Sequence, residues 1–317
     1  MAKPKGSFLM KKKILFLALF FVLCSLLTSR PLYAAWIRTF TVTPTSTAFA
    51  DQDPDLGEVT SSPSLSVTIS VRQLYANQTW TLDISATTDL VSGGNTIPAG
   101  NIRWTVTGSG TPTPTFYNGT LVRGVYLQAG TGRGRNNGRA DITSSFYFYL
   151  TNAWSYPTGN YSGTVTLRLT VPGAAAQTRT VTLSTNIGSR AKLQFGLLAM
   201  NFPDANPDSV NPIPANVNPL SVTSSGRTGS SQTVTLTCLA SGDFFSGLNT
   251  IAISNMTWTA TGTGYVPGTM NRITAQTAGS WTGSGQRTGT FSCFLANSWS
   301  YTVGNYSTSI NYTLTAP

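Results

Sequence analysis

The residue types that carry out most enzymatic chemistry are scarce in this chain. Histidine is absent from all 317 residues, which removes the usual serine–histidine and cysteine–histidine nucleophile systems and the commonest transition-metal ligand. Glutamate occurs only at Glu58, and the spacing of the aspartates does not indicate the paired carboxylates of a glycoside hydrolase. The sequence therefore predicts a protein that is not an enzyme.

One run of acids has the alternating spacing that begins a calcium-binding loop. The four acids are Asp51, Asp53, Asp55 and Glu58. A later stretch repeats the run as Asp204, Asn206 and Asp208 but has no acid that matches the glutamate. Pro54 and Pro207 lie inside the two runs, and they favour a rigid Asx-type turn equally well. We therefore expect no cofactor and a structural turn, with calcium as the one candidate ligand.

Three arginines occur within a stretch that is rich in glycine and asparagine. Residues 130–139 read GTGRGRNNGR and contain Arg133, Arg135 and Arg139. We expect a mobile, positively charged loop that could contact an anionic polysaccharide or lipid headgroups. A solvated hairpin tip without a ligand is the alternative. The glycines do not predict a phosphate-binding loop, because no strand-to-helix context surrounds them.

Aromatic side chains could form a platform on which a sugar ring stacks. Of the seven tryptophans, four fall at matching positions of an internal repeat, which favours two equivalent cores over two ligand sites. The better candidates for an exposed platform are Trp36, Trp80, Trp281, Tyr117 and Tyr126.

The internal repeat organises the whole chain. Residues 150–162 read LTNAWSYPTGNYS and residues 295–307 read LANSWSYTVGNYS. Each copy follows an apolar run and precedes an alternating run, which predicts a strand, an aromatic loop with a glycine turn, and a return strand. We expect the repeated aromatic residues to lie in two equivalent cores. These residues are Trp104, Trp154, Tyr156, Tyr161, Trp258, Trp299, Tyr301 and Tyr306.

The first 34 residues have the order of a secretory signal peptide. Three lysines precede an apolar run from Ile14 to Leu27, and small residues end at Ala34. The run is short for a membrane span, which needs about 20 residues, so we expect no transmembrane segment in the mature chain. Six of the 20 basic residues lie in this segment, which leaves 14 against 10 acids, or about +4. We therefore expect an extracytoplasmic protein of a bacterium, in the periplasm or on the cell surface, with no nucleic-acid partner.

The mature chain divides into two β-rich copies. Period-2 alternation of β-branched and aromatic residues predicts about seven short strands in each. We expect a β-sandwich over 35–173, a linker or extra strand over 174–189, and a second sandwich over 190–317. The strand-like run from Thr178 to Asn186 has no counterpart after the second copy. It is either an added edge strand or linker, or a sign that copy two keeps an open edge. Such an edge could pair with the segment from Trp36 to Val42 of another molecule.

Two cysteines remain after the signal peptide, Cys238 and Cys293. Export favours their pairing as a disulfide. In the repeat, Cys238 aligns with Ile84 and Cys293 aligns with Phe148, as expected if an apolar core pair in copy one has become a cysteine pair in copy two.

The order Cys238, Trp258 and Cys293 resembles that of immunoglobulin-like domains, on strands B, C and F. The resemblance covers copy two fully and copy one by alignment. It departs from antibody domains because Tyr306 follows the second cysteine, whereas the tyrosine-corner residue precedes it. The resemblance implies an all-β fold of two tandem immunoglobulin-like antiparallel β-sandwiches, each complete with a final strand G.

Tandem modules of this kind typically serve in surface adhesion, assembly or spacing, and the fold does not choose among them. We therefore expect a secreted or cell-surface structural or adhesive protein without catalytic activity. Its partners would be other surface proteins or further copies of itself, as in a fimbrial-type assembly subunit. The alternative is a carbohydrate-binding surface module with a polysaccharide ligand.

Overall fold

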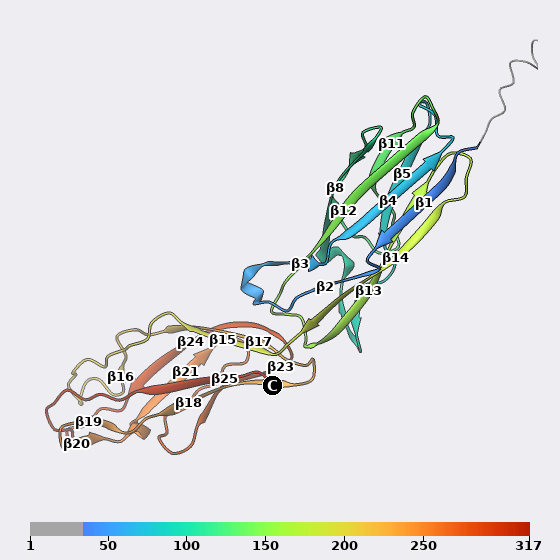
Figure 1. Cartoon of the computed structure of the whole chain (residues 1–317). Helices are drawn as coiled ribbons and strands as arrows, with labels where there is room; N and C mark the ends of the chain where they lie inside the picture. Colours follow the sequence, from blue (N-terminus) through green and yellow to red (C-terminus); the bar gives the residue numbers. More distant parts are fainter. Residues whose placement is uncertain (1–33) are drawn as a thin grey trace, which may run out of the picture.

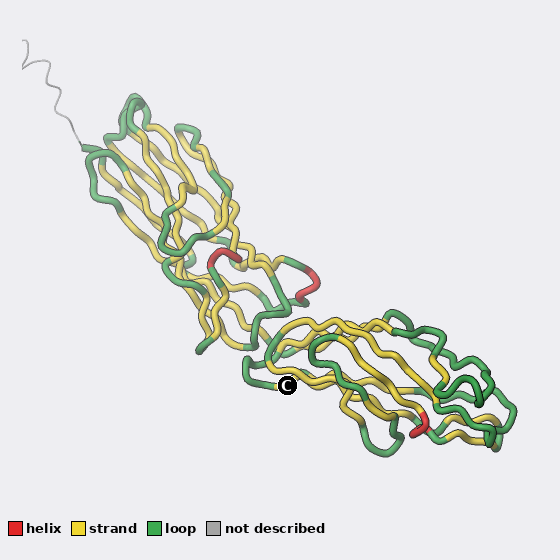
Figure 2. Tube along the Cα trace, turned by 180° about the vertical axis from the view of Figure 1, so that it is seen from behind, coloured by secondary structure: helices red, strands yellow, loops and turns green. Residues whose placement is uncertain are grey.

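The structure is a computed structural model that describes residues 34–317. The predicted signal peptide therefore lies outside the described residues, apart from its last residue. The described chain consists of β-strands and loops with three short 3-10 turns (Figure 2). It forms two β-sandwich domains that lie end to end (Figure 1). Within these residues, no helix has the length and apolar character to cross a membrane.

Domain 1 comprises the strands up to Ile187. They are β1 (Trp36–Thr43), β2 (Ser46–Phe49), β3 (Glu58–Ser62), β4 (Leu65–Arg72), β5 (Thr79–Ala86), β6 (Leu90–Ser92), β7 (Asn95–Ile97), β8 (Ile102–Thr111), β9 (Thr115–Phe116), β10 (Gly119–Thr120), β11 (Leu127–Arg133), β12 (Arg139–Thr151), β13 (Gly159–Thr170) and β14 (Gln177–Ile187). One layer has the order β1-β4-β12-β8, and the other has the order β2-β14-β13-β5-β11. The 3-10 turns η1 (Pro54–Leu56) and η2 (Ala99–Asn101) lie in the connections.

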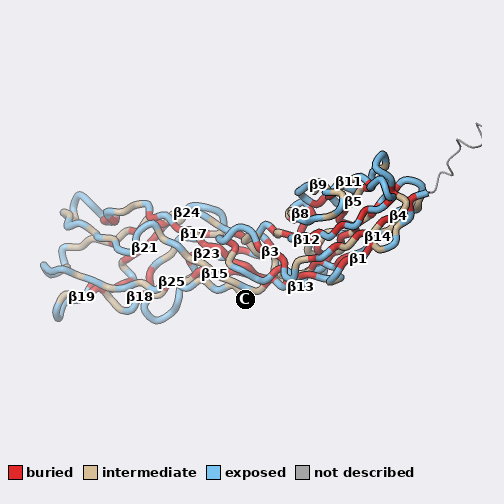
Figure 3. The backbone as a smooth tube through the Cα atoms, turned by 45° about the horizontal axis from the view of Figure 1, so that its top comes forward, coloured by how far each residue is buried: buried red, intermediate tan, exposed pale blue. Residues whose placement is uncertain are grey.

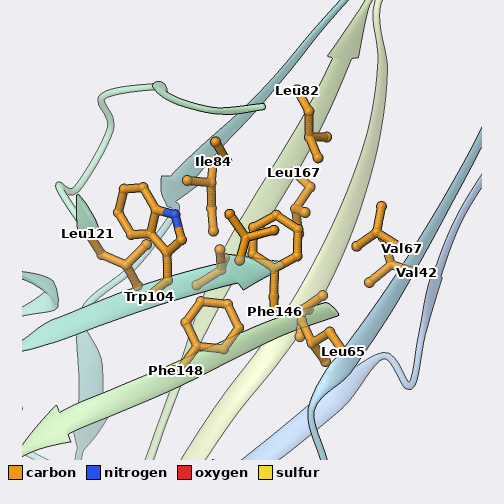
Figure 4. Close-up of a cluster of buried hydrophobic side chains, with 14 of the residues drawn as sticks. Val42, Leu65, Val67, Leu82, Ile84, Trp104, Leu121, Phe146, Phe148 and Leu167 are labelled. Carbon is orange, nitrogen blue, oxygen red and sulfur yellow. The ribbon is translucent and has the colours of Figure 1, made fainter. Parts of the chain in front are cut away.

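The core of domain 1 follows from alternation along the strands. In β12 every second residue is buried, because successive side chains of a strand point to opposite faces. Phe146 and Phe148 of β12 point toward Ile84 of β5 and Leu167 of β13, while Trp104 of β8 packs beside them (Figure 4). All five side chains are at most 1% exposed.

Domain 2 comprises the strands from Arg190 onward. They are β15 (Arg190–Phe195), β16 (Ile213–Pro214), β17 (Leu220–Arg227), β18 (Thr233–Ala240), β19 (Phe244–Ser246), β20 (Asn249–Ile251), β21 (Met256–Thr261), β22 (Gly268–Thr269), β23 (Gln276–Thr282), β24 (Gly285–Leu295) and β25 (Ile310–Thr315), with the turn η3 (Ile253–Asn255). One layer has the order β15-β17-β24-β21-β22, and the other contains only β23-β18-β25.

The strand registers make the two domains equivalent residue by residue. Trp104 lies opposite Phe148 in domain 1, and Trp258 lies opposite Cys293 in domain 2. Gly119 and Gly268 pack on the faces of the two tryptophans, where a Cβ atom would clash with the ring. The predicted all-β fold of two tandem immunoglobulin-like sandwiches is confirmed.

The prediction that each copy is complete is wrong for domain 2. The run from Thr178 to Asn186 lies in β14, which pairs with β13 on one side and, in parallel, with β2 on the other. Among the described residues, no strand occupies the corresponding place beside β25. The assignment of Cys238 to strand B failed because three strands of the domain, β15, β16 and β17, precede its strand β18. The segment Trp36–Val42 is β1 and pairs with β4 of its own domain, so it is not a free strand.

Candidate functional site

Strand β14 closes the core of domain 1 along one edge. Its residues Val181, Leu183 and Ile187 alternate toward the core and are at most 4% exposed. On the neighbouring β13, Leu167 and Leu169 are fully buried. The edge of this layer is therefore covered both by backbone hydrogen bonds and by apolar side chains.

The corresponding edge of domain 2 is open. In β18, Cys238 lies opposite Tyr312 and Leu236 opposite Leu314 of β25. In domain 1 the same places are taken by Ile84 opposite Leu167 and Leu82 opposite Leu169. Tyr312 and Leu314 are half-buried, whereas their counterparts are fully buried. β25 is also shorter, with 6 residues against 12 in β13.

The opposite side of this gap is also unpaired. The counterpart of β2, the stretch from 199 to 202, forms no strand. Its Met200 and Phe202 are half-buried against the core, as is Phe195 of β15, whose ring centre lies 4.7 Å from that of Tyr312. We call the gap between β25 and residues 199–202, with β15 at its rim, the strand slot. Figure 3 shows less buried chain in the outer half of domain 2 than in domain 1.

The strand slot has the two properties that bind an extended peptide. A sheet edge presents unpaired backbone N–H and C=O groups, which can continue the ladder with a further strand. Half-buried apolar side chains beside it can contact alternate side chains of that strand. The slot therefore suits a β-strand as its ligand.

A second functional surface joins the two domains. We call the end of domain 1 formed by residues 50–57 and 151–158 foot 1, and the end of domain 2 that meets it, formed by Arg190, Lys192, Arg227 and Thr228, head 2. The Arg227 side chain is fully buried. The Nη1 atom of Arg227 donates to Oδ1 of Asp51 at 3.2 Å. Its Nη2 atom donates to the carbonyl of Ala153 at 2.7 Å and also to Oδ1 of Asn152.

Further contacts surround this arginine. Arg190 donates to Oδ2 of Asp51 at 3.0 Å, and Lys192 pairs with Asp55. The bond from Lys192, together with one from Nε1 of Trp154, lowers the pKa of the Asp55 carboxyl below its usual range. Loss of water lowers the pKa of the Arg227 guanidinium, which nevertheless stays charged because its ordinary value is so high. Foot 1 is thus a receptor for guanidinium and ammonium groups.

The acids predicted to hold calcium do not converge on one point. Asp51 and Asp55 face the cations of head 2, and Asp53 caps the η1 turn by accepting from the backbone N–H of Asp55. Glu58 forms a two-pronged pair with Arg103, which lowers its pKa. In the part of the chain that is described, no group of three or more acids, cysteines or histidines is arranged to hold a metal ion.

The repeated aromatic residues divide into core and end-loop positions. Trp104, Trp258, Tyr156 and Tyr161 are buried, as predicted, while Tyr301 and Tyr306 are half-buried. The prediction fails for Trp299, which is 71% exposed, and its counterpart Trp154 is only half-buried. The reason is that both rings lie in the end loops, where Nε1 of Trp299 donates to Asp208 as Trp154 does to Asp55.

The predicted sugar platform is not assembled. Trp80 and Trp281 are buried, and they lie on different strands of the strand pair that the two domains share. Trp80 on β5 lies opposite Gly132, whereas Trp281 on β23 lies opposite Val234, the counterpart of Trp80. Trp36, Tyr117 and Tyr126 are exposed, but the ring of Tyr126 lies 3.7 Å from the guanidinium of Arg168.

A shallow hollow of about 730 Å³ lies on domain 1 beside foot 1. Asn160, Ser184 and Asn186 supply its polar lining from β13 and β14. Its aromatic neighbours Phe49 and Tyr161 are buried, so no exposed ring is available there for stacking on a sugar.

The arginine loop is attached to a neighbouring turn. The backbone N–H of Gly134 donates to Gln78, and that of Leu74 donates to Gly138. A Cβ on Gly134 would lie 1.7 Å from the Leu74 carbonyl oxygen, so the two segments are in direct contact. Arg133, Arg135 and Arg139 are exposed, and Arg139 lies 3.7 Å from Asp141. The anionic ligand remains a prediction, whereas the expected loose tip is instead tied down by backbone hydrogen bonds.

Cys238 and Cys293 are both buried in the core of domain 2, and both are free thiols in the structure. They lie on opposite layers, on β18 and β24, in the places of Ile84 and Phe148. Burial raises the pKa of Cys238 to about 12 and that of Cys293 to about 11. The disulfide between them stays a prediction.

Sequence reasoning missed Arg227, Arg190 and Lys192. Arg227 ends a run, LSVTSSGR, that repeats LSVTISVR ending at Arg72, so the repeat itself contained the signal. Its partner Asp51 lies 176 positions away, and nothing local in the sequence connects the two.

Comparisons with known proteins complete this description. No family model matches the chain, and no curated protein matches it. Among solved structures, it is similar to the CsuC–CsuE chaperone–tip adhesion subunit complex from archaic chaperone-usher Csu pili of Acinetobacter baumannii, with 10% identity, TM-score 0.34 and coverage of 87% of this chain and 99% of that chain. The CupB6 tip adhesin of Pseudomonas aeruginosa gives 9% identity, TM-score 0.31 and coverage of 80% and 86%. The CooA pilin subunit of enterotoxigenic Escherichia coli gives 11% identity, TM-score 0.28 and coverage of 47% and 99%.

Proposed function

We propose that this chain is an extracytoplasmic, non-catalytic assembly subunit of the fimbrial type, whose second domain is completed by a β-strand of another surface protein. The observation that carries the proposal is the open place beside β25, which β14 fills in domain 1. Because the two domains are built to the same register, the difference between them defines what is missing. This comparison supports a strand as the ligand of the open edge.

The sequence of β14 describes the strand that fits. Val181, Leu183 and Ile187 face the core of domain 1 at alternate positions. In β13, the residues opposite these three side chains lie between 159 and 165. The corresponding stretch of domain 2 is 304–310. The partner strand therefore runs antiparallel to β25 and carries apolar side chains at every second position.

The origin of the partner strand is suggested by the path of the chain. Strand β14 ends at Ile187, and the first strand of domain 2 begins at Arg190, two residues further on. In this molecule the strand that completes one sandwich thus leads directly into the next sandwich. The strand that completes domain 2 is accordingly the leading segment of a further sandwich subunit.

A synthetic peptide with the sequence of β14, Gln177–Ile187, tests the proposal on the mature chain. We expect slower hydrogen–deuterium exchange at the outward-facing amides of β25, and a higher melting temperature of domain 2, because a ligand that binds only the native state stabilises it. The matched control is the same peptide with Val181 and Leu183 replaced by serine. Exchange in β25 that is unchanged at the highest soluble peptide concentration would exclude the slot as a strand-binding site.

A further inference from the structure

The outer end of domain 2 repeats the loop architecture of foot 1. We call residues 203–210 together with 296–304 foot 2. Nε1 of Trp299 donates to Oδ1 of Asp208 at 2.9 Å, as Trp154 does to Asp55 at 2.8 Å. Nδ2 of Asn297 donates to the carbonyl of residue 205 at 2.9 Å, as Asn152 does to that of residue 52 at 3.1 Å. The two feet are therefore held in one geometry.

Foot 2 also repeats the acceptors that hold head 2 in foot 1. The carboxylates of Asp51 and Asp55 correspond to those of Asp204 and Asp208. The amide of Asn152 and the carbonyl of Ala153 correspond to those of Asn297 and Ser298. Within residues 34–317, no arginine or lysine pairs with Asp204 or Asp208. The two carboxylates that correspond to the cation-binding pair of foot 1 are exposed in foot 2, whereas Oδ1 of Asn297 accepts from the backbone N–H of Ser298 at 3.0 Å.

Two positions around foot 2 carry exposed apolar side chains where domain 1 has a polar residue or glycine, whereas the exposed Leu56 of foot 1 is replaced by Ser209. Val303 is 98% exposed and Leu248 is fully exposed, and their counterparts in domain 1 are Thr158 and Gly94. Thr158 lies in the joint, since its backbone N–H donates to the carbonyl of Thr228 at 3.0 Å. A joint within one chain benefits from the high effective concentration of its tethered parts, whereas a joint between separate chains needs more contact energy. Added apolar side chains at these positions are what a joint between chains requires.

We propose that foot 2 is a docking site for the head of a further β-sandwich, which presents a guanidinium and an ammonium group as head 2 does. This inference deepens the proposed function, because it names the part of the partner that follows the inserted strand. In domain 1 the completing strand leaves the slot at foot 1, and only Gly188 and Ser189 separate it from head 2. A strand inserted in the slot of domain 2 with the same polarity leaves it at foot 2. It therefore delivers the next head to that surface.

The partner has a head of the domain 2 kind rather than that of domain 1. Arg72, the counterpart of Arg227, is already held by Asp141 at 2.9 Å and also donates to the carbonyl of Val71. The place of Asp141 is taken in domain 2 by Gln286, which leaves Arg227 available to foot 1. A head that docks thus carries an arginine at this position with no acid beside it.

The test is a three-domain chain, made by joining a second copy of residues 173–317 after Pro317. Pro317 corresponds to Pro172 and lies at head 2, near the junction of the domains (Figure 1), so the added strand begins where the path of β14 begins in domain 1. With Trp36 replaced by Phe in all chains, Trp299 of domain 2 is the most exposed tryptophan. We expect its quenching by acrylamide to be lost in the three-domain chain and retained in the two-domain chain. Trp299 of the added copy is replaced with Phe, so that the measured fluorescence quenching does not include the exposed tryptophan of that copy.

Charge reversal separates docking from strand insertion. Asp208→Lys in the middle domain should restore acrylamide quenching of Trp299. Adding Lys192→Asp in the added copy restores an ion pair with the charges exchanged, and the quenching should be lost again. Asp208→Lys in the two-domain chain is the control, and it measures how far loss of the Trp299 hydrogen bond alone changes the quenching and the melting temperature. Exchange in β25 is followed in parallel. Slowed β25 exchange with full quenching of Trp299 would overturn the docking site and leave the strand slot standing, whereas unchanged β25 exchange would reject both.

Discussion

Domain 1 and domain 2 place corresponding residues in corresponding registers, but they differ in what covers one edge of the core. In domain 1, β14 pairs with β13 along its length, and Leu167 and Leu169 of β13 are fully buried. In domain 2 the counterparts Tyr312 and Leu314 remain half-buried. Tyr312 is suited to this position, because its ring packs on the core while its hydroxyl tolerates water. The comparison teaches that the open edge arises from a missing strand and not from a weaker sequence in the remaining ones.

The ends of the two domains also differ in whether they are covered. Foot 1 is covered by head 2, and Arg227 is buried in the joint. Foot 2 keeps the same acceptors and exposes Trp299. Domain 1 is therefore complete on both counts, at its edge and at its foot, whereas domain 2 is open on both. The two openings lie on the path that one partner would follow.

The largest expected difference between the domains concerns matched leucines. Leu169→Ala should destabilise domain 1 by about 3 kcal/mol, because it removes a fully buried side chain and leaves a cavity. Leu314→Ala should cost domain 2 only about 1 kcal/mol, since much of that side chain already contacts water. Denaturant melts read by hydrogen exchange in each domain provide the measurement. Equal costs would mean that the edge of domain 2 is covered after all.

A second comparison concerns the two equivalent arginines. Arg227→Met should weaken the joint by about 2 kcal/mol, because Asp51 and the Ala153 carbonyl lose a charged donor. Arg72→Met should cost less than about 1 kcal/mol, as its partner Asp141 is half-exposed. Calorimetry would show the melting of the two domains uncoupled only in the first variant. The same uncoupling in both variants would contradict the role assigned to Arg227.

A third expected difference is an alkaline loss of stability caused by the two thiols, which only domain 2 carries. Burial raises the pKa of Cys238 to about 12 and of Cys293 to about 11, from an ordinary value of 9.0. Well below pH 9 both states keep the thiols protonated and the contribution is full. Above pH 9 the unfolded chain ionises first, so stability falls as pH rises toward the folded pKa values, by about 1 kcal/mol for each thiol at pH 10.

Urea melts of the reduced chain at pH 8 and pH 10 measure this loss. Domain 1 carries Ile84 and Phe148 at the two positions and provides the internal control. A chain in which the predicted disulfide has formed should show no such loss from these residues. Equal alkaline losses in both domains of the reduced chain would argue against the thiols as the cause.

Much of the fold could be predicted from the sequence, because alternation and duplication are local signals. The alignment of the two copies matches Cys238 with Ile84 and Cys293 with Phe148, and the strand registers agree with both matches. The duplicated Trp299 misled the prediction of the core, since a residue can be repeated for a hydrogen bond to an end-loop aspartate as well as for burial. The open edge of domain 2 was one of the two interpretations of the run from Thr178 to Asn186, which has no counterpart after the second copy. The pairing of Trp36–Val42 with β4 of its own domain was not predicted, because it depends on contacts between distant parts of the chain.

The two-residue connection of Gly188 and Ser189 has a mechanical consequence. Tension applied along the molecule through domain 2 reaches domain 1 through β14, which has 11 residues and lies lengthwise between β13 and β2. A load parallel to a strand strains its hydrogen bonds together, whereas a perpendicular load opens them one after another. We expect single-molecule stretching to break domain 2 before domain 1. Since rupture under load is governed by the unfolding rate, insertion of a partner strand in the slot should convert domain 2 into an equally resistant link.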